Sequence, residues 1–169
     1  PRMTQHVRWL GTSIAVVILI ADLSTKATMI PYLTESGGLV ELLPFVDLRL
    51  GYNRGVSFGL LSSNSEWAPW ALAFIAFIVS AYLAMRLWRA TYKHDAIWAG
   101  LIIGGALGNA IDRLIDGVVT DFIDIHVLGF HWPTFNLADI AIVLGLAIVM
   151  LKGMRPSEKQ IVANQDTIG

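Results

Sequence analysis

The chain has 169 residues, of which 55% are hydrophobic and only 15% charged, against roughly 25% charged in an average soluble domain. This composition excludes a disordered protein, a collagen-like repeat and a soluble nucleic-acid-binding protein. The net charge is −1, and cysteine is absent, which excludes disulfides, thiolate metal sites and a cysteine nucleophile. The length permits one domain with a handful of membrane spans at most.

Four apolar runs predict four membrane-spanning helices, at about residues 9–30, 67–86, 96–115 and 135–152. Only the second run has about the 20 uncharged residues that a helix needs to cross a bilayer. The other three reach that length by including aspartates. A cleaved signal peptide is an alternative for the first run, but three more runs follow it and the small-residue cleavage pattern is missing.

Basic residues predict the orientation of these helices. Eight of the twelve Lys and Arg residues lie before the first run, between the second and third, or after the fourth: Arg2, Arg8, Arg86, Arg89, Lys93, Lys152, Arg155 and Lys159. The positive-inside rule therefore places both termini and the second connection in the cytoplasm. The loop 31–66 and the segment 112–135 then face outward, and residues 153–169 form a cytoplasmic tail.

The predicted fold class is an all-α integral membrane protein with a small outer β-element between the first two spans. Residues 39–53 alternate apolar and polar side chains in strand-like stretches, and Pro44 and several glycines interrupt them. We find no internal repeat and no second domain, so residues 1–169 are expected to form a single membrane domain.

Three of the predicted helices carry polar side chains at a similar depth. At ~1.5 Å per residue from the cytoplasmic end, Asp22 lies ~20 Å up its helix, Asn109 and Asp112 ~20–24 Å, and Asp139 ~18 Å. An ionised carboxylate at such a depth costs at least ~2.5–3.5 kcal/mol, which makes these residues candidates for function. An ion-pair network that only holds helices together is the structural alternative.

The spacing within each cluster follows helical faces. Asp22 and Lys26 are four residues apart with the acid first, the favourable order for an ion pair. Asp139 has no basic residue within one turn and is expected to stay protonated, as one half of an acid/base pair requires. Gly104 and Gly108 form a Gly-x-x-x-Gly motif, which predicts close packing of the third helix against a neighbour beside Asn109.

Other hydrolytic chemistries fit the sequence poorly. The chain has no His-Glu-x-x-His, and its four histidines are scattered. A Gly-x-Ser-x-Gly motif surrounds Ser57, but it needs a strand-turn-helix in an α/β sheet. A catalytic serine–lysine pair formed by Ser24 and Lys26 is also disfavoured, because residues two apart fall on different faces of a helix. The remaining hydrolytic mechanism uses two carboxylates that share a proton. The candidate residues for it are Asp112, Asp116, Asp121, Asp124 and Asp139.

Four sequence blocks resemble the lipoprotein signal peptidase family, also called signal peptidase II. They are Asp22-Leu-Ser-Thr-Lys26, Asn53-Arg-Gly-Val-Ser-Phe-Gly59, Gly104-Gly-Ala-Leu-Gly-Asn-Ala-Ile-Asp-Arg113 continued by Gly117-Val-Val-Thr-Asp-Phe122, and Phe135-Asn-Leu-Ala-Asp139. They occur in the family order within roughly residues 9–152, and the long block together with the last is very specific.

The resemblance implies an aspartic peptidase of the bacterial cytoplasmic (inner) membrane that needs no metal or cofactor. Its substrates would be prolipoproteins, cut immediately before the diacylglyceryl-modified cysteine, and its partners these substrates and membrane lipids, with no nucleic acid. The implied catalytic pair is Asp121 and Asp139, and a monomer suffices for this chemistry. The positions expected to shape the site or hold the substrate are Asp22, Lys26, Asn53, Gly55, Asn109, Asp112, Arg113, Asn136 and Ala138.

Two alternatives to Asp121 stay open at this point. Asp112 has the more suitable depth, although Asp116 and Arg113 are local partners that suit it better to orientation. Asp124 is three residues from Asp121 and would share its face on a helix. Residues 123–134 match no family block. At the level of function, a small proton-coupled transporter and a purely structural membrane subunit are the competing interpretations.

Overall fold

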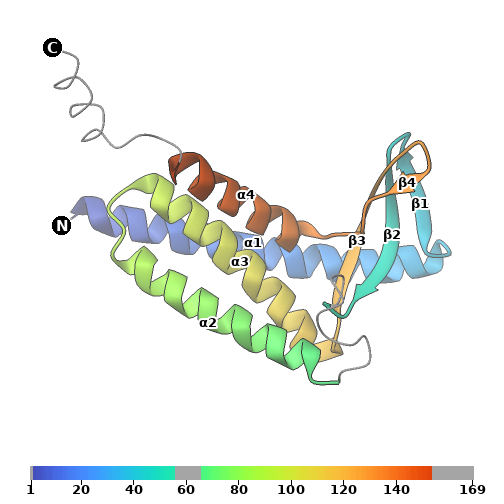
Figure 1. The fold of residues 1–169 in the computed structure, drawn as a ribbon, viewed down its shortest axis with the longest axis horizontal. Helices are drawn as coiled ribbons and strands as arrows, with labels where there is room; N and C mark the ends of the chain where they lie inside the picture. The colour runs from blue at the N-terminus through green and yellow to red at the C-terminus, as the bar shows by residue number, and fades with distance from the viewer. Residues whose placement is uncertain (1, 56–65, 154–169) are drawn as a thin grey trace, which may run out of the picture.

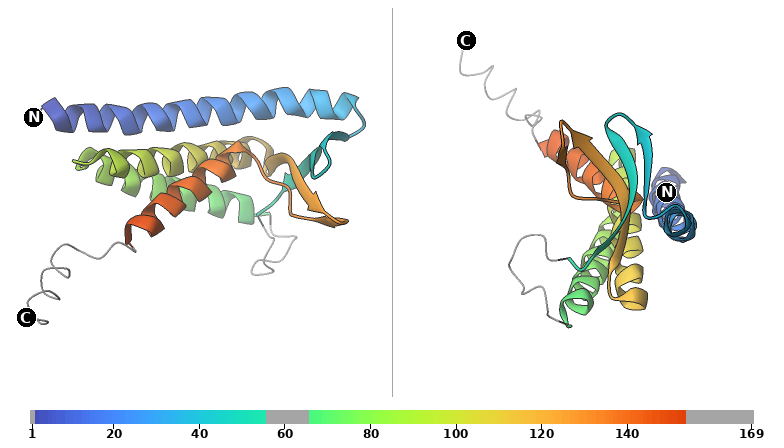
Figure 2. Two further views of the ribbon diagram at one scale, coloured as in Figure 1. Left: turned by 90° about the horizontal axis from the view of Figure 1, so that it is seen from above. Right: turned by 90° about the vertical axis from the view of Figure 1, so that its right-hand side faces the viewer.

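The computed structural model describes residues 2–55 and 66–153 (Figure 1). Most of these residues form four helices, α1 (Arg2–Glu35), α2 (Ala68–Trp88), α3 (Lys93–Asp116) and α4 (Leu137–Gly153). Each helix overlaps one of the four apolar runs of the sequence. α1 continues for 34 residues through Pro31, a length of about 51 Å, and this length carries it beyond the other helices to the sheet (Figure 2).

A four-stranded antiparallel sheet lies at the end of the helices far from the N-terminus (Figure 1). Its strands are β1 (Leu39–Leu43), β2 (Val46–Asn53), β3 (Val119–Val127) and β4 (Phe130–His131), in that spatial order. β1 and β2 form within residues 39–53, where the pattern predicted strands. The all-α fold class is wrong, because β3 and β4 make the chain a helix-plus-sheet protein. The missed signal was the number of β-branched residues in this segment, which are Val119, Thr120, Ile123, Ile125 and Val127.

α3 is the central helix and packs against each of the other three (Figure 2). Its glycines allow this approach. A Cβ added at Gly104 would lie 2.6 Å from the carbonyl oxygen of Ala15 in α1. A Cβ added at Gly105 would lie 2.5 Å from the carbonyl oxygen of Ala138 in α4. The close packing predicted from the glycine motif is therefore confirmed.

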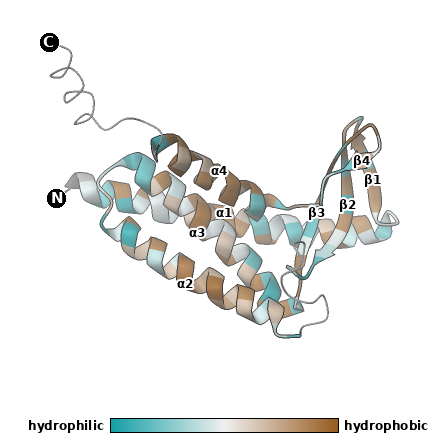
Figure 3. Ribbon diagram, viewed as in Figure 1, coloured by the Kyte–Doolittle hydropathy of each residue, from teal (hydrophilic) through white to brown (hydrophobic). Residues whose placement is uncertain are grey.

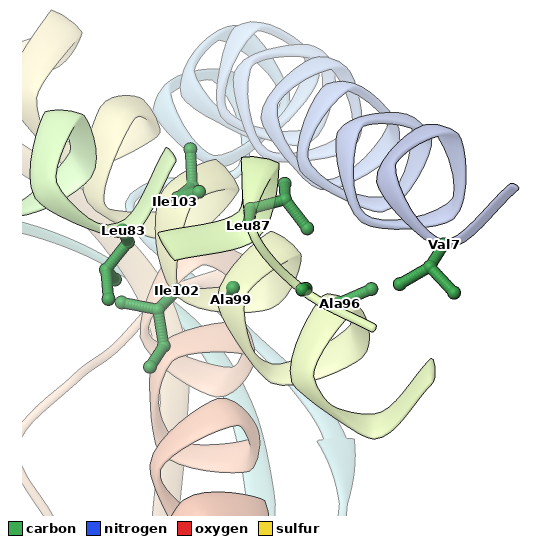
Figure 4. Close-up of a cluster of buried hydrophobic side chains, with 8 residues drawn as sticks. Val7, Leu83, Leu87, Ala96, Ala99, Ile102 and Ile103 are labelled. Carbon is green, nitrogen blue, oxygen red and sulfur yellow. The ribbon is translucent and has the colours of Figure 1, made fainter. Parts of the chain in front are cut away.

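One cluster of buried hydrophobic side chains lies at the end of the bundle near the N-terminus. It contains Val7, Leu83, Leu87, Ala96, Ala99, Ile102 and Ile103 (Figure 4). Most of the buried polar side chains lie nearer the sheet, where polar contacts add to the packing of the helices.

Hydrophobic residues make up much of α2 and α4 (Figure 3), and many of their side chains are exposed. α2 exposes Phe74, Ile78 and Met85, and α4 exposes Val143 and Met150. An apolar surface of this extent needs a lipid or protein partner. Within the described ranges, two helices are long and apolar enough to cross a membrane, Thr4–Glu35 and Ala68–Trp88. A count of four spans stays a prediction, since α4 has only 17 residues.

Candidate active site

Asp121 lies on β3, which carries it to the junction of the sheet and the helices. On the neighbouring strand β2 it faces Gly51. The side chain is only 1% exposed. Its Oδ1 accepts a 2.7 Å hydrogen bond from Nδ2 of Asn136, and the side chain of Asn53 also hydrogen-bonds to it.

Asp139 lies in the first turn of α4, where it takes part in a reciprocal cap. Its backbone N–H donates to Oδ1 of Asn136 at 3.0 Å, and its Oδ2 accepts from the N–H of Asn136 at 3.2 Å. This pairing satisfies two backbone donors at the start of the helix. Oδ1 of Asp139 accepts a 2.8 Å bond from Nδ2 of Asn109. The described contacts of Asp139 therefore come from amide groups, and no ion pair between it and a basic side chain is found among the described residues.

Two asparagine side chains connect the two carboxylates. Nδ2 of Asn136, which already donates to Asp121, lies 3.0 Å from Oδ1 of Asn109, and Nδ2 of Asn109 donates to Asp139. Asn136 is completely buried and also reaches the carbonyl oxygen of Thr120. Asp121 and Asp139 are thus positioned by one continuous network built from α3, β3 and the start of α4.

A buried ammonium group lies on the other side of Asn109. Nζ of Lys26 is 2.6 Å from Oδ2 of Asp22, 2.9 Å from Oδ2 of Asp112 and 3.0 Å from Oδ1 of Asn109. Asp22 also accepts a 2.9 Å bond from the N–H of Ala138 at the start of α4. The cluster therefore ties α1 to both α3 and α4, and the ion pair predicted from the Asp22–Lys26 spacing is confirmed.

Asp112 joins the same network through different groups from those that bind Asp121 and Asp139. Its Oδ2 forms an ion pair with Nζ of Lys26 and accepts a 3.1 Å hydrogen bond from the N–H of Thr120 on β3. Thr120 is the functional neighbour that the sequence reasoning missed, because its N–H and carbonyl contribute rather than its side chain. The strand pattern beside Asp121 could have placed it there.

Arg113 and Gly55 border the same region. Nη1 of Arg113 donates to the carbonyl oxygen of Asn109 at 3.3 Å, and its Nε is buried without a hydrogen-bond partner in the described ranges. The guanidinium is near enough to interact electrostatically with Asp139 and Asp121. Gly55 has a φ of +86°, and a Cβ there would collide with Leu72, so a glycine suits this turn.

The surroundings of Asp121 favour its protonated form. Burial, and after it the negative charge of Asp139, raise the pKa of Asp121 to about 6. Hydrogen bonds from Asn53 and Asn136 and the charge of Lys26 act in the opposite direction without cancelling these effects. Asp121 therefore holds a proton more readily than an exposed aspartate.

Asp124 belongs to a different cluster. Its Oδ2 is 3.0 Å from Nε of Arg49 and 2.8 Å from Nδ1 of His131. The predicted shared helical face with Asp121 is wrong, because the two residues lie three apart on a strand, where such positions point to opposite sides. The described residues contain no group of three His, Asp or Glu side chains placed to hold a metal.

Three other residues that the sequence suggested for hydrolysis lie outside the network of Asp121 and Asp139 or outside the described ranges. Asp116, at the end of α3, is exposed. Ser24 is exposed while Lys26 is buried, as their assignment to different faces of the helix predicted. Ser57 and the rest of residues 56–65 lie outside the described residues.

Comparisons with known proteins agree on one family. The sequence model of signal peptidase (SPase) II matches residues 14–155. Lipoprotein signal peptidases of Yersinia pestis and Yersinia pseudotuberculosis are each 42% identical over 171 residues, which cover 98% of this chain and 98% of theirs. A solved bacterial membrane enzyme, 27% identical, superposes with a TM-score of 0.71 over 87% of this chain and 94% of its own. The chain belongs to the signal peptidase II family.

Proposed function

We propose that this protein is a membrane aspartic endopeptidase that removes signal peptides from prolipoproteins, cutting before the diacylglyceryl-modified cysteine. The relatives named lipoprotein signal peptidases support the substrate class. The observation that carries the mechanism is the connection of Asp121 and Asp139 through Asn136 and Asn109. Two aspartates held this way provide the acid and the base that peptide hydrolysis by water requires.

The environment of Asp121 assigns the roles in the proposed pair. Asp121, whose pKa is raised, carries the proton, so in this proposal Asp139 accepts a proton from the attacking water instead of staying protonated as its spacing from basic residues suggested. Asp121 donates its proton to the scissile carbonyl oxygen as the water oxygen bonds to the carbon. When the C–N bond breaks, Asp139 gives its proton to the amine. The new carboxyl group returns a proton to Asp121, which restores the starting state.

The remaining site residues support this reaction. Lys26, Asp22 and Asp112 hold α1, α3 and α4 in register around Asn109. Ala138 fixes the start of α4 through its N–H. Arg113, with an Nε that lacks a partner in the described ranges, is available to a substrate carbonyl beside the pair. Asn53 and Gly55 border the site from the end of β2.

In the proposed topology, the chain forms a single domain that spans the bacterial inner membrane four times. The spans correspond to residues 9–30, 67–86, 96–115 and 135–152, with both termini and the tail 153–169 in the cytoplasm. The outer loop 31–66, the sheet and the two aspartates then lie at the outer face. A lipid-anchored substrate can approach this site laterally, and a monomer is sufficient.

The test is cleavage of a diacylglyceryl-modified prolipoprotein by the purified full chain in detergent, followed on gels. We expect Asp121→Asn and Asp139→Asn to fold, as checked by thermal melting, but to yield no product. Ser57→Ala is the control and should still cut. If Asp121→Asn keeps cutting while Asp112→Asn does not, the assignment of the pair is wrong. If the wild-type protein does not cut, the proposed activity itself is wrong.

A further inference from the structure

A groove lies at the opposite end of the molecule from the two aspartates. It has a volume of about 450 Å³ and is lined by Gln5, Arg8, Trp9, Thr12 and Trp88. Four of these residues, Gln5 to Thr12, lie on one face of α1, because they are spaced three or four residues apart. Trp88 is the last residue of α2. Arg8 is about 21 Å along α1 from Asp22, so the groove is separate from the proposed catalytic site.

Arg8 forms no ion pair with any acidic residue in the described ranges. Its guanidinium carbon lies 5.1 Å from the centre of the Trp88 ring, within the range of a cation–π contact. Its Nε is buried and has no hydrogen-bond partner in the described part of the chain. Among the described residues, no carboxylate lines the groove. A guanidinium that lies over a ring and has an N–H without a partner is well suited to a phosphate group.

The walls of the groove are aromatic and open to the surroundings. Trp9 is 63% exposed and Trp88 is 65% exposed. α1 and α2 converge directly beside them, since a Cβ added at Gly11 would collide with Leu87. Tryptophan side chains at helix ends typically lie at the level of lipid headgroups. The groove thus combines a phosphate-binding cation with surfaces that contact the glycerol and upper acyl chains of a lipid.

We propose that this groove binds the phosphodiester headgroup of an anionic phospholipid in the cytoplasmic leaflet. Arg8 donates to the phosphate oxygens, Gln5 adds an amide donor, and the two tryptophans enclose the start of the acyl chains. A basic pocket between helices on the cytoplasmic side is a recognised setting for such lipids. A zwitterionic headgroup brings an additional cation close to Arg8, and none of the described residues in the groove is an acid that would offset it. The leaflet rests on the proposed orientation, whereas the site itself does not rest on peptidase activity.

The test is native mass spectrometry of the full chain in detergent, titrated with phosphatidylglycerol or with phosphatidylcholine of the same acyl chains. We expect a clear preference for phosphatidylglycerol. Arg8→Gln should weaken its binding about tenfold or more, the loss typical of one charge-assisted hydrogen bond. Arg8→Lys should recover part of the preference. Lys93→Gln is the matched control, because it removes the same charge from the same end of the molecule without touching the groove, and should bind as the wild-type protein does.

Three results would overturn the proposal. Equal binding of the two lipids would exclude recognition of charge, and an unchanged affinity in Arg8→Gln would exclude this groove. Equal competition by free glycerol phosphate would indicate a phosphate site rather than a lipid site. Peptidase activity of Arg8→Gln in detergent should stay at the wild-type level, and a thermal melt verifies its folding, so failure of the lipid site is distinguishable from failure of the proposed catalytic function.

Discussion

At the scale of single residues, the polar groups of the site do two different things. One group, formed by Asp22, Lys26 and Asp112, joins helices through ion pairs. The other group is Asp121 and Asp139, whose carboxylates are connected through amide side chains and can still gain or lose a proton. The difference lies in the partner. An ammonium group stabilises a carboxylate in its ionised form, whereas an amide hydrogen bond shifts the balance much less.

This distinction predicts that Asp121→Asn stabilises the protein at neutral pH. Because the pKa of Asp121 is about 6 in the folded chain, above its ordinary value of 3.8, the folded state binds the proton more tightly. Stability therefore falls as pH rises from about 4 to about 6, and the asparagine variant avoids this loss, on the order of 2–3 kcal/mol. Thermal melts in detergent should show a higher midpoint for the variant at pH 7.5 and nearly equal midpoints at pH 4.

The control for this prediction is Asp124→Asn. It removes a buried carboxylate that pairs with Arg49 and His131, and it should lower the melting temperature at pH 7.5 instead. A variant Asp121→Asn that shows no pH-dependent gain over the wild-type protein would contradict the assignment of the raised pKa.

Lys26 provides a second prediction at the residue scale. Lys26→Met leaves Asp22 and Asp112 buried without a cation and should destabilise the fold by about 3–5 kcal/mol. Lys152→Met is the comparison, because its ion pair with Asp95 is half exposed and contributes at most about 1 kcal/mol. Melting of both variants in detergent measures the difference, and equal losses would argue against an anchoring role of Lys26.

At the scale of elements, the start of α4 is the part of the fold on which the site depends most. Its cap holds Asp139, its Ala138 N–H binds Asp22, and its backbone lies directly against Gly105 of α3. Helix α4 therefore cannot shift relative to α3 without moving a catalytic candidate.

We accordingly expect Gly105→Ala to lower kcat by at least about tenfold, with a stability loss of about 1–3 kcal/mol. The new methyl group would press on the carbonyl oxygen of Ala138, which is backbone and cannot rotate away. Gly145→Ala serves as control in the same helix pair, since its Cβ would mainly meet the side chain of Ile102. Cleavage rates and melts of both variants test this, and an equal loss of kcat would mean that the position of α4 is not what matters.

At the scale of the whole molecule, polar and apolar regions separate along the helix axes. Arg8, Arg86 and Lys93 lie in helix segments at the N-terminal end of the bundle, as does the groove beside Trp88, whereas the sheet lies at the other end (Figure 1). A bilayer can accommodate the apolar flanks between these ends. This arrangement gives the proposed orientation a direct test.

The chain has no cysteine, so single cysteines can report on orientation. Phe45→Cys places a thiol in the exposed turn between β1 and β2, and Thr91→Cys places one between α2 and α3. We expect a membrane-impermeant maleimide to label the first in intact spheroplasts and the second only after permeabilisation. The opposite pattern would overturn the proposed orientation.

The sequence by itself determined the features that depend on local pattern. Apolar runs located α1 to α4, the Asp22–Lys26 spacing indicated their ion pair, and Gly104 and Gly108 indicated a close helix contact. Each of these follows from the fixed geometry of a helix within a few residues. The motifs also indicated the family, which the comparisons then established.

Only the tertiary structure decided which groups surround each acid. Asp121 reaches Asn136 because β3 pairs with β2, a strand about seventy residues earlier in the chain, and no local pattern specifies the register of such a pairing. The same pairing turns Asp124 toward Arg49 and His131. Likewise, the partners of Asp139 come from its own helix cap and from α3. Long-range contacts form where burial and hydrogen bonding across the whole fold are satisfied together, which is why local pattern left several candidate acids and could not give the partners of each.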